Sequence, residues 1–145
     1  HGVQFNYLIK RINTKSSQAN FYSKSATGLV LSNYKKFDNK IEPNLFTGFA
    51  FDWENSKYFL SYENRFNYNF SINKYFLQKA RVGIAPYVGK YGDLHTWLML
   101  QVENKSDAKN NIVYTPMVRV FKGDLLTEIG LSNYMNIMFN FIKRF

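Results

Sequence analysis

The most constraining feature of the sequence is a long stretch in which large apolar residues alternate with polar ones. Between residues 58 and 70 every even position except Asn64 is aromatic or leucine, whereas the odd positions are mainly polar. A period of two is typical of a β-strand whose two faces meet different surroundings. The stretch exceeds the common strand length of about 5–6 residues and reaches the about 9–11 residues with which a tilted strand crosses a bilayer. It therefore predicts a β-sheet protein with strands long enough for a membrane barrel.

The same alternation recurs along most of the chain, and no segment has a convincing helical pattern. Counting strands from residues 21–34 to residues 136–145 gives eight. We therefore predict an all-β fold in which residues 1–145 form a single domain, an up-and-down antiparallel β-barrel of membrane type. Residues 1–20 are left over by this count. Their alternation predicts either an extra strand, in a barrel of ten, or an N-terminal extension.

The predicted connections between strands alternate in length. The longer ones are residues 35–41, 71–77, 104–111 and 133–136, and the shorter ones between them are residues 55–57, 89–93 and 122–124. Barrels of the outer membrane have short periplasmic turns and longer external loops. The alternation therefore predicts that the longer set is external.

The last ten residues, 136–145, resemble the final strand of bacterial outer-membrane β-barrel proteins, which closes the barrel and ends in Phe. The residues that share the apolar parity are Ile137, Phe139, Phe141 and Phe145. Lys143 departs from the family pattern, which usually has an aromatic residue there. The resemblance implies an integral protein of the outer membrane of a Gram-negative bacterium, exported with a signal peptide. Removal of a signal peptide, or a remnant of a tag, explains a chain that begins at His1.

The positive charge of the chain favours a negatively charged partner. The formal net charge is +9, which suits anionic lipid, lipopolysaccharide or nucleic acid; the alternative is a lysine-rich composition with solvated loops. In the predicted barrel the external rim would meet lipopolysaccharide phosphates. The lysines predicted to make this contact are Lys35, Lys36, Lys40, Lys74, Lys105 and Lys109. We expect a surface or partner-binding protein with lipid or a protein as its partner, and we favour a non-enzymatic role over an enzymatic one. Nucleic acid is not the expected partner, because no RNA-binding aromatic signature is present.

Charged residues of both signs face the interior if the aromatic parity points outward. Buried charges must be paired or solvated, because an isolated one costs several kcal/mol. The sequence therefore predicts an internal ladder of ion pairs formed by Glu63, Arg65, Arg81, Glu103, Arg119 and Glu128. Because a barrel of eight strands is just wide enough for its own side chains, we expect this ladder to fill the lumen. A polar channel or a ligand-selective lumen is the alternative.

Aromatic residues gather near the two ends of the strand at residues 58–70. Trp53 and Tyr58 flank one short turn, whereas the residues near the opposite end are Tyr68, Phe70, Tyr75 and Phe76. These positions suit the two aromatic girdles of a membrane barrel. The alternative is the aromatic core of a soluble sandwich. A soluble basic barrel or sandwich that binds an anionic ligand or nucleic acid is therefore the second hypothesis.

No cofactor, metal or catalytic residue is predicted by the leading hypothesis. The chain has no cysteine, which excludes disulfides and thiolate metal sites. His1-Gly2 resembles the start of copper histidine-brace proteins, including lytic polysaccharide monooxygenases, and this resemblance implies a Cu(II) site at His1 that His95 would complete. A lipid hydrolase would instead combine His95 with an acid and either Ser61 or Ser132. We expect His95 to be an ordinary packed interior residue.

Overall fold

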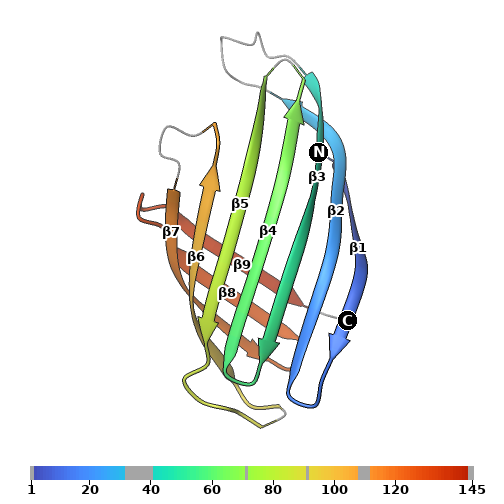
Figure 1. The fold of residues 1–145 in the computed structure, drawn as a ribbon. Helices are drawn as coiled ribbons and strands as arrows, with labels where there is room; N and C mark the ends of the chain where they lie inside the picture. Colours follow the sequence, from blue (N-terminus) through green and yellow to red (C-terminus); the bar gives the residue numbers. More distant parts are fainter. Residues whose placement is uncertain (1, 32–40, 71, 91, 108–111, 144–145) are drawn as a thin grey trace.

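The computed structural model describes residues 2–31, 41–70, 72–90, 92–107 and 112–143, in which nine β-strands and no helices occur. The strands are β1 (Gly2–Asn13), β2 (Ser17–Leu31), β3 (Ile41–Asn55), β4 (Tyr58–Asn69), β5 (Asn73–Ile84), β6 (His95–Lys105), β7 (Ile112–Lys122), β8 (Leu125–Leu131) and β9 (Ile137–Lys143). They form one sheet in the order of the sequence, and every neighbouring pair is antiparallel (Figure 1). The predicted all-β, up-and-down arrangement is confirmed.

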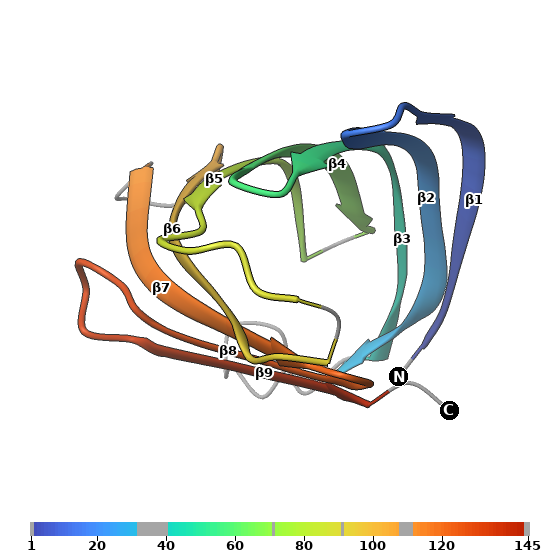
Figure 2. The same cartoon turned by 90° about the horizontal axis from the view of Figure 1, so that it is seen from below.

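The sheet curves into an open half-barrel, with β1 and β9 as its two edges (Figure 2). Within the described residues, no ladder joins β1 to β9. We call the concave side of the sheet the inner face and the convex side the outer face. The upper end is where the even-numbered strands finish, and the lower end is where the odd-numbered strands finish. No helix in the described ranges has the length and apolar character needed to span a bilayer.

The extra strand that the alternation of residues 1–20 predicted is present as β1, so the described strands number nine and the predicted count of eight, or ten, is wrong. β1 pairs with β2 along its length, and β2 begins at Ser17 instead of Phe21. The turn between them is tight, since the backbone N–H of Thr14 donates to the carbonyl of Ser17 at 2.8 Å. A bulge between Leu8 and Lys10 shifts the register of β1. This shift interrupts the alternation, as expected where an extra residue enters one strand of a pair.

The connections depart from the predicted rhythm at two places. β5 begins at Asn73, so the predicted loop 71–77 is a short turn, in which Ile72 N–H donates to the Asn69 carbonyl at 2.7 Å. The predicted short turn 89–93 belongs to a longer connection, 85–94, at the lower end. The long connections therefore do not all leave one end. The predicted turn at 122–124 does occur, and Gly123 permits it by adopting a left-handed φ of 57°.

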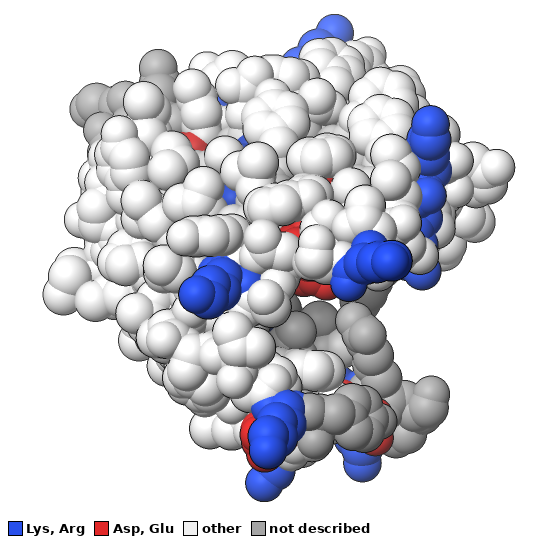
Figure 3. Space-filling model, turned by 60° about the horizontal axis from the view of Figure 1, so that its bottom comes forward, with Lys and Arg blue, Asp and Glu red and all other residues white. Residues whose placement is uncertain are grey.

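The two faces of the sheet have opposite polarity. Among the described residues, the buried apolar ones are only Ala50, Ala85, Met99 and Met117, whereas the buried polar ones are Asn20, Asn67, Asn69, Gln101, Thr115, Glu128 and Ser132. On the outer face, large side chains such as Phe5 (64% exposed) and Phe139 (66% exposed) point into the surroundings. The space-filling view shows this surface as broad and largely uncharged, with Lys and Arg beside a hollow that contains acidic atoms (Figure 3). This is the reverse of the distribution that water imposes on a soluble protein.

Candidate functional site

The inner face brings polar residues from neighbouring strands side by side. The register aligns one row across β2 to β7, formed by Asn20, Asp52, Ser61, Arg81, Gln101 and Thr115. Within this row Asn20 Nδ2 donates to Asp52 Oδ1 at 2.7 Å, and Arg81 Nε donates to Gln101 Oε1 at 2.7 Å. Because side chains alternate between the faces of a strand, the polar parity of each strand faces the same interior. The candidate site is therefore this polar interior.

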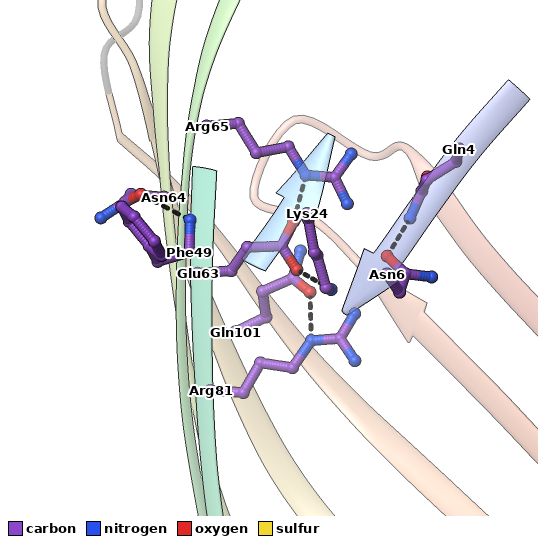
Figure 4. A network of polar contacts seen from close by, with 9 residues as sticks. All are labelled: Gln4, Asn6, Lys24, Phe49, Glu63, Asn64, Arg65, Arg81 and Gln101. Carbon is purple, nitrogen blue, oxygen red and sulfur yellow. Dashed lines mark hydrogen bonds and ion pairs between the residues drawn. The ribbon is translucent and has the colours of Figure 1, made fainter. Parts of the chain in front are cut away.

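The first ion-pair cluster is centred on Glu63 of β4 (Figure 4). Lys24 Nζ of β2 lies 2.7 Å from Glu63 Oε2, and Arg65 Nε donates to Glu63 Oε1. β3 lies between β2 and β4, and the register places Gly48 opposite Lys24 and Ala50 opposite Glu63, while the Phe46 ring centroid lies 4.7 Å from the Arg65 guanidinium carbon. The small residues leave room for Lys24 and Glu63 to meet across an intervening strand.

The second ion-pair cluster is centred on Glu128 of β8, which is only 2% exposed. Arg119 of β7 places Nη2 2.6 Å and Nε 2.7 Å from Glu128 Oε1. Asn140 Nδ2 of β9 donates to Glu128 Oε2 at 3.0 Å, and Arg81 Nη1 of β5 lies 3.6 Å from Glu128 Oε1. One carboxylate therefore connects β5, β7, β8 and β9, including strands that are not neighbours in the sheet.

Five of the six residues predicted for the ion-pair ladder lie in these two clusters, and Glu103 lies opposite Lys79 in the register of β5 and β6. Sequence reasoning missed Lys24 and Asn140. Lys24 lies within the strand predicted at residues 21–34 and shares the parity of the inward Asn20, but its contact with Glu63 depends on the register of β2, β3 and β4. Asn140 has the inward parity of β9, but its pairing with Glu128 depends on the register between the last two strands.

The inner face also encloses two hollows, which its side chains do not fill. One hollow, of about 600 Å³, has residues of both clusters and Lys79 in its lining. The other, of about 570 Å³, is bordered at the lower end by His95, Trp97 and Arg119. Gln18 and Glu54 line both. The two hollows are therefore adjacent and share part of their lining.

Asn64, the exception in the alternation of residues 58–70, is a polar side chain on the outer face. Asn64 Oδ1 accepts a hydrogen bond from the backbone N–H of Phe49 at 3.1 Å (Figure 4). Gly48 precedes Phe49 in the chain, and a Cβ added to Gly48 would collide with the backbone carbonyl oxygen of Asn64. The strands thus approach closely here, and the amide of Asn64 satisfies a backbone donor within an apolar surface.

The predicted ligand-binding lysines are placed only in part. Lys35, Lys36, Lys40 and Lys109 lie outside the described residues. Lys74 is exposed near the upper end of the outer face, with Nζ 4.6 Å from the ring centroid of Tyr68. Lys105 lies on the opposite face, with Nζ 4.0 Å from the Tyr75 ring centroid and 3.2 Å from Asp107 Oδ1.

The aromatic residues expected to form girdles divide between the two faces. Tyr58 is exposed beside the turn at the lower end, while Tyr68 and Phe70 make an edge contact, with centroids 4.9 Å apart, at the upper end. Phe76 also points outward, but its neighbour Tyr75 points inward because adjacent residues of a strand face opposite ways. Tyr75 therefore does not join the outer aromatic residues.

In the part of the chain that it describes, the structure does not assemble a site for the two alternatives that use histidine, the copper histidine brace and the lipid hydrolase with His95 and Ser132. His1 lies outside the described residues, and within the described ranges no group of three or more His, Cys, Asp or Glu residues is placed to hold a metal ion. His95 lies at the lower end with its ring centroid 6.2 Å from that of Phe121. Ser132 follows β8 at the upper end, where its hydroxyl accepts from Asn136 N–H at 3.0 Å. The structure therefore does not bring His95 and Ser132 together.

Comparison of the chain with protein-family models, with curated proteins and with solved structures gave no match. The class of the protein therefore rests on its own fold and site. It is an all-β antiparallel half-barrel with an apolar outer face and an ion-paired inner face.

Proposed function

We propose that this chain is an integral β-barrel protein of the outer membrane of a Gram-negative bacterium. The observation that carries the proposal is the reversed polarity of its two faces. Burial of apolar surface is worth about 25 cal/mol per Å², and soluble monomers rarely expose contiguous apolar patches above a few hundred Å². Side chains such as Phe5, Phe49, Phe66 and Phe139 are exposed over much of the outer face. A bilayer covers such a face, whereas a water-soluble barrel would leave it hydrated.

The position of charge on the outer face supports the same proposal. Among the described outward positions of β2 to β9, the charged residues are Lys74, Lys122 and Lys143. Each lies at or next to the end of its strand. On β1 the register places Lys10 opposite the outward Phe21, close to the end of the strand at Asn13, so the charged outward positions all lie towards the strand ends. A lysine or arginine at the midplane of a membrane barrel costs about 2–4 kcal/mol, and the cost falls towards the interfaces. The distribution of lysines follows this dependence on depth.

Insertion into a bilayer also requires that the two edges be paired. Unpaired backbone groups in hydrocarbon cost several kcal/mol each, which is why membrane barrels are closed. The direction of the chain reverses from each strand to the next, so in a sheet of nine strands the first, β1, and the last, β9, run in the same direction. We therefore include in the proposal that β1 and β9 close the barrel through a parallel ladder. This closure would differ from that of most bacterial single-chain barrels, which have an even number of strands and close with an antiparallel pair.

The activity we propose is contact with anionic lipid or lipopolysaccharide, or with a protein partner, at the upper end. Lys74 and Lys105 lie at this end, on opposite faces of the sheet, and β2 and β6, which precede Lys35, Lys36, Lys40 and Lys109 in the sequence, finish there. Phosphate groups are suitable partners for lysines at such a rim. This proposal requires no catalytic step.

The test is to refold the full chain into detergent micelles and into vesicles that contain lipopolysaccharide. We expect β-sheet circular dichroism, and gel migration that differs between heated and unheated samples. A chain that folds as a soluble monomer without detergent would contradict the proposal. Strongly salt-dependent binding of that soluble chain to single-stranded nucleic acid would favour the basic soluble alternative instead.

A further inference from the structure

A shallow trough runs over the outer face of β1 to β4. Its volume is about 410 Å³, and its lining is almost entirely apolar. The residues whose outward side chains line it are Phe5, Ser25, Thr27, Leu45, Thr47, Phe66 and Tyr68. In the proposed membrane protein this trough faces the hydrocarbon of the lipid.

The register explains why a trough forms here. Phe5, Ser25, Thr47 and Phe66 lie side by side on four successive strands. Two small residues therefore form a floor between two aromatic walls, and Phe5 and Phe66 are 64% and 47% exposed. The hydroxyls of Ser25 and Thr47 hydrogen-bond to each other at 3.3 Å. Since these groups partner each other, the floor tolerates an apolar occupant.

A positive charge lies at the upper end of the trough. Tyr68 lines the trough, and Lys74 is opposite Tyr68 in the register, with its ammonium 4.6 Å from the ring centroid. No acidic residue occurs among the described outward positions of β1 to β5. The trough therefore combines one long apolar surface with one uncompensated cation at the end where the lipid headgroups would lie.

We propose that this trough is a binding site for an anionic lipid, with one acyl chain along Ser25 and Thr47 and the headgroup phosphate at Lys74. The inference rests on the proposed membrane location and identifies one specific lipid contact. A lipid matches the trough because it has a single charged end and an otherwise apolar body. A protein segment would bring backbone polar groups against a floor whose hydroxyls already partner each other.

The test uses the full chain in phosphatidylcholine vesicles that contain a minor fraction of phosphatidylglycerol carrying a spin label on its acyl chain. Immobilised label reports lipid held at the protein surface. We expect Ser25→Phe, which fills the trough, to reduce the immobilised fraction, and Thr27→Phe to do so independently. We expect Lys74→Gln to lower the preference for phosphatidylglycerol over labelled phosphatidylcholine by roughly fivefold, the effect of about one lysine near a headgroup.

Two matched variants control for general changes of the outer face. Thr127→Phe enlarges an outward threonine on β8, and Lys122→Gln removes an outward lysine at the lower end. Equal lipid retention in Ser25→Phe and Thr127→Phe would overturn the inference, as would a dimer that Ser25→Phe dissociates. If the wild-type chain does not enter the vesicles, the proposed function fails and this inference fails with it. Insertion without selective retention removes the lipid site alone.

Discussion

The two glutamates at the centres of the ion-pair clusters differ in how much of the sheet they connect. Glu63 has a side chain that is 15% exposed, and its partners come from β2 and from its own strand. Glu128 is 2% exposed, and its partners come from β5, β7 and β9. The comparison shows that ion pairs with similar chemistry have different structural roles. Glu63 bridges one strand locally, whereas Glu128 holds together distant parts of the curved sheet.

The largest expected effect is that of Glu128→Gln. This change leaves Arg81 and Arg119 in the interior without their carboxylate, and the loss of one partner of a buried ion pair costs about 3–5 kcal/mol. Urea unfolding in lipid vesicles, followed through the fluorescence of Trp53 and Trp97, measures the free energy of unfolding. A loss below about 1 kcal/mol would show that Glu128 does not have the connecting role assigned to it.

Glu63→Gln is the matched variant, and we expect it to destabilise the protein less. Lys24 and Arg65 are partly exposed and can be hydrated when the carboxylate is gone. The expected loss is about 2 kcal/mol, typical of hydrogen bonds to a charged group. The same urea titration gives the comparison. If Glu63→Gln were as destabilising as Glu128→Gln, exposure would not explain the difference between the clusters.

A double-mutant cycle separates the two arginines that approach Glu128. Arg119 lies 2.6 Å from the carboxylate, whereas Arg81 reaches it from across the interior at 3.6 Å. We expect a coupling free energy of about 1 kcal/mol between Arg81 and Glu128, and a larger one between Arg119 and Glu128. No measurable coupling for Arg81 would mean that the contact across the interior contributes nothing to stability.

Disulfide cross-linking tests the proposed closing ladder between β1 and β9, and of these changes it has the smallest expected effect on stability. The chain contains no native cysteine, so an introduced pair forms the only disulfide. We would combine cysteine at Phe5 or Tyr7 with cysteine at Phe139 or Phe141, because all four side chains point outward from the edge strands. Oxidation of the protein in vesicles should link at least one pair within a single chain. Cross-links found only between chains would contradict closure by β1 and β9.

Much of the fold could be predicted from the sequence, because alternation records which side of a strand is apolar. Asn64, the one exception between residues 58 and 70, remains on the outer face and satisfies the N–H of Phe49. The alternation of residues 1–20 did predict the extra strand, which is β1, but the predicted total of eight or ten was wrong because this one strand makes the described sheet nine-stranded. The prediction of a loop at residues 71–77 was wrong because Asn73 to Leu77 already belong to β5 and follow its alternation of inward and outward side chains.

The site could be predicted as a set of inward residues but not as a set of partners. Parity identifies Glu63 and Glu128 as inward, yet it does not reveal that Lys24 reaches Glu63 over Gly48 and Ala50. It also does not reveal that Arg81 reaches Glu128 from three strands away. These contacts depend on register and curvature, which arise from all the strands together.

The sequence by itself determined that this chain forms long antiparallel strands with one apolar and one polar face, since side-chain direction in a strand depends only on position. The tertiary structure decided that the strands of the described residues number nine, that the polar face is the concave one, and that Glu128 joins four strands. The physical reason is that curvature and pairing bring together residues far apart in the chain, and local alternation contains no information about those distances.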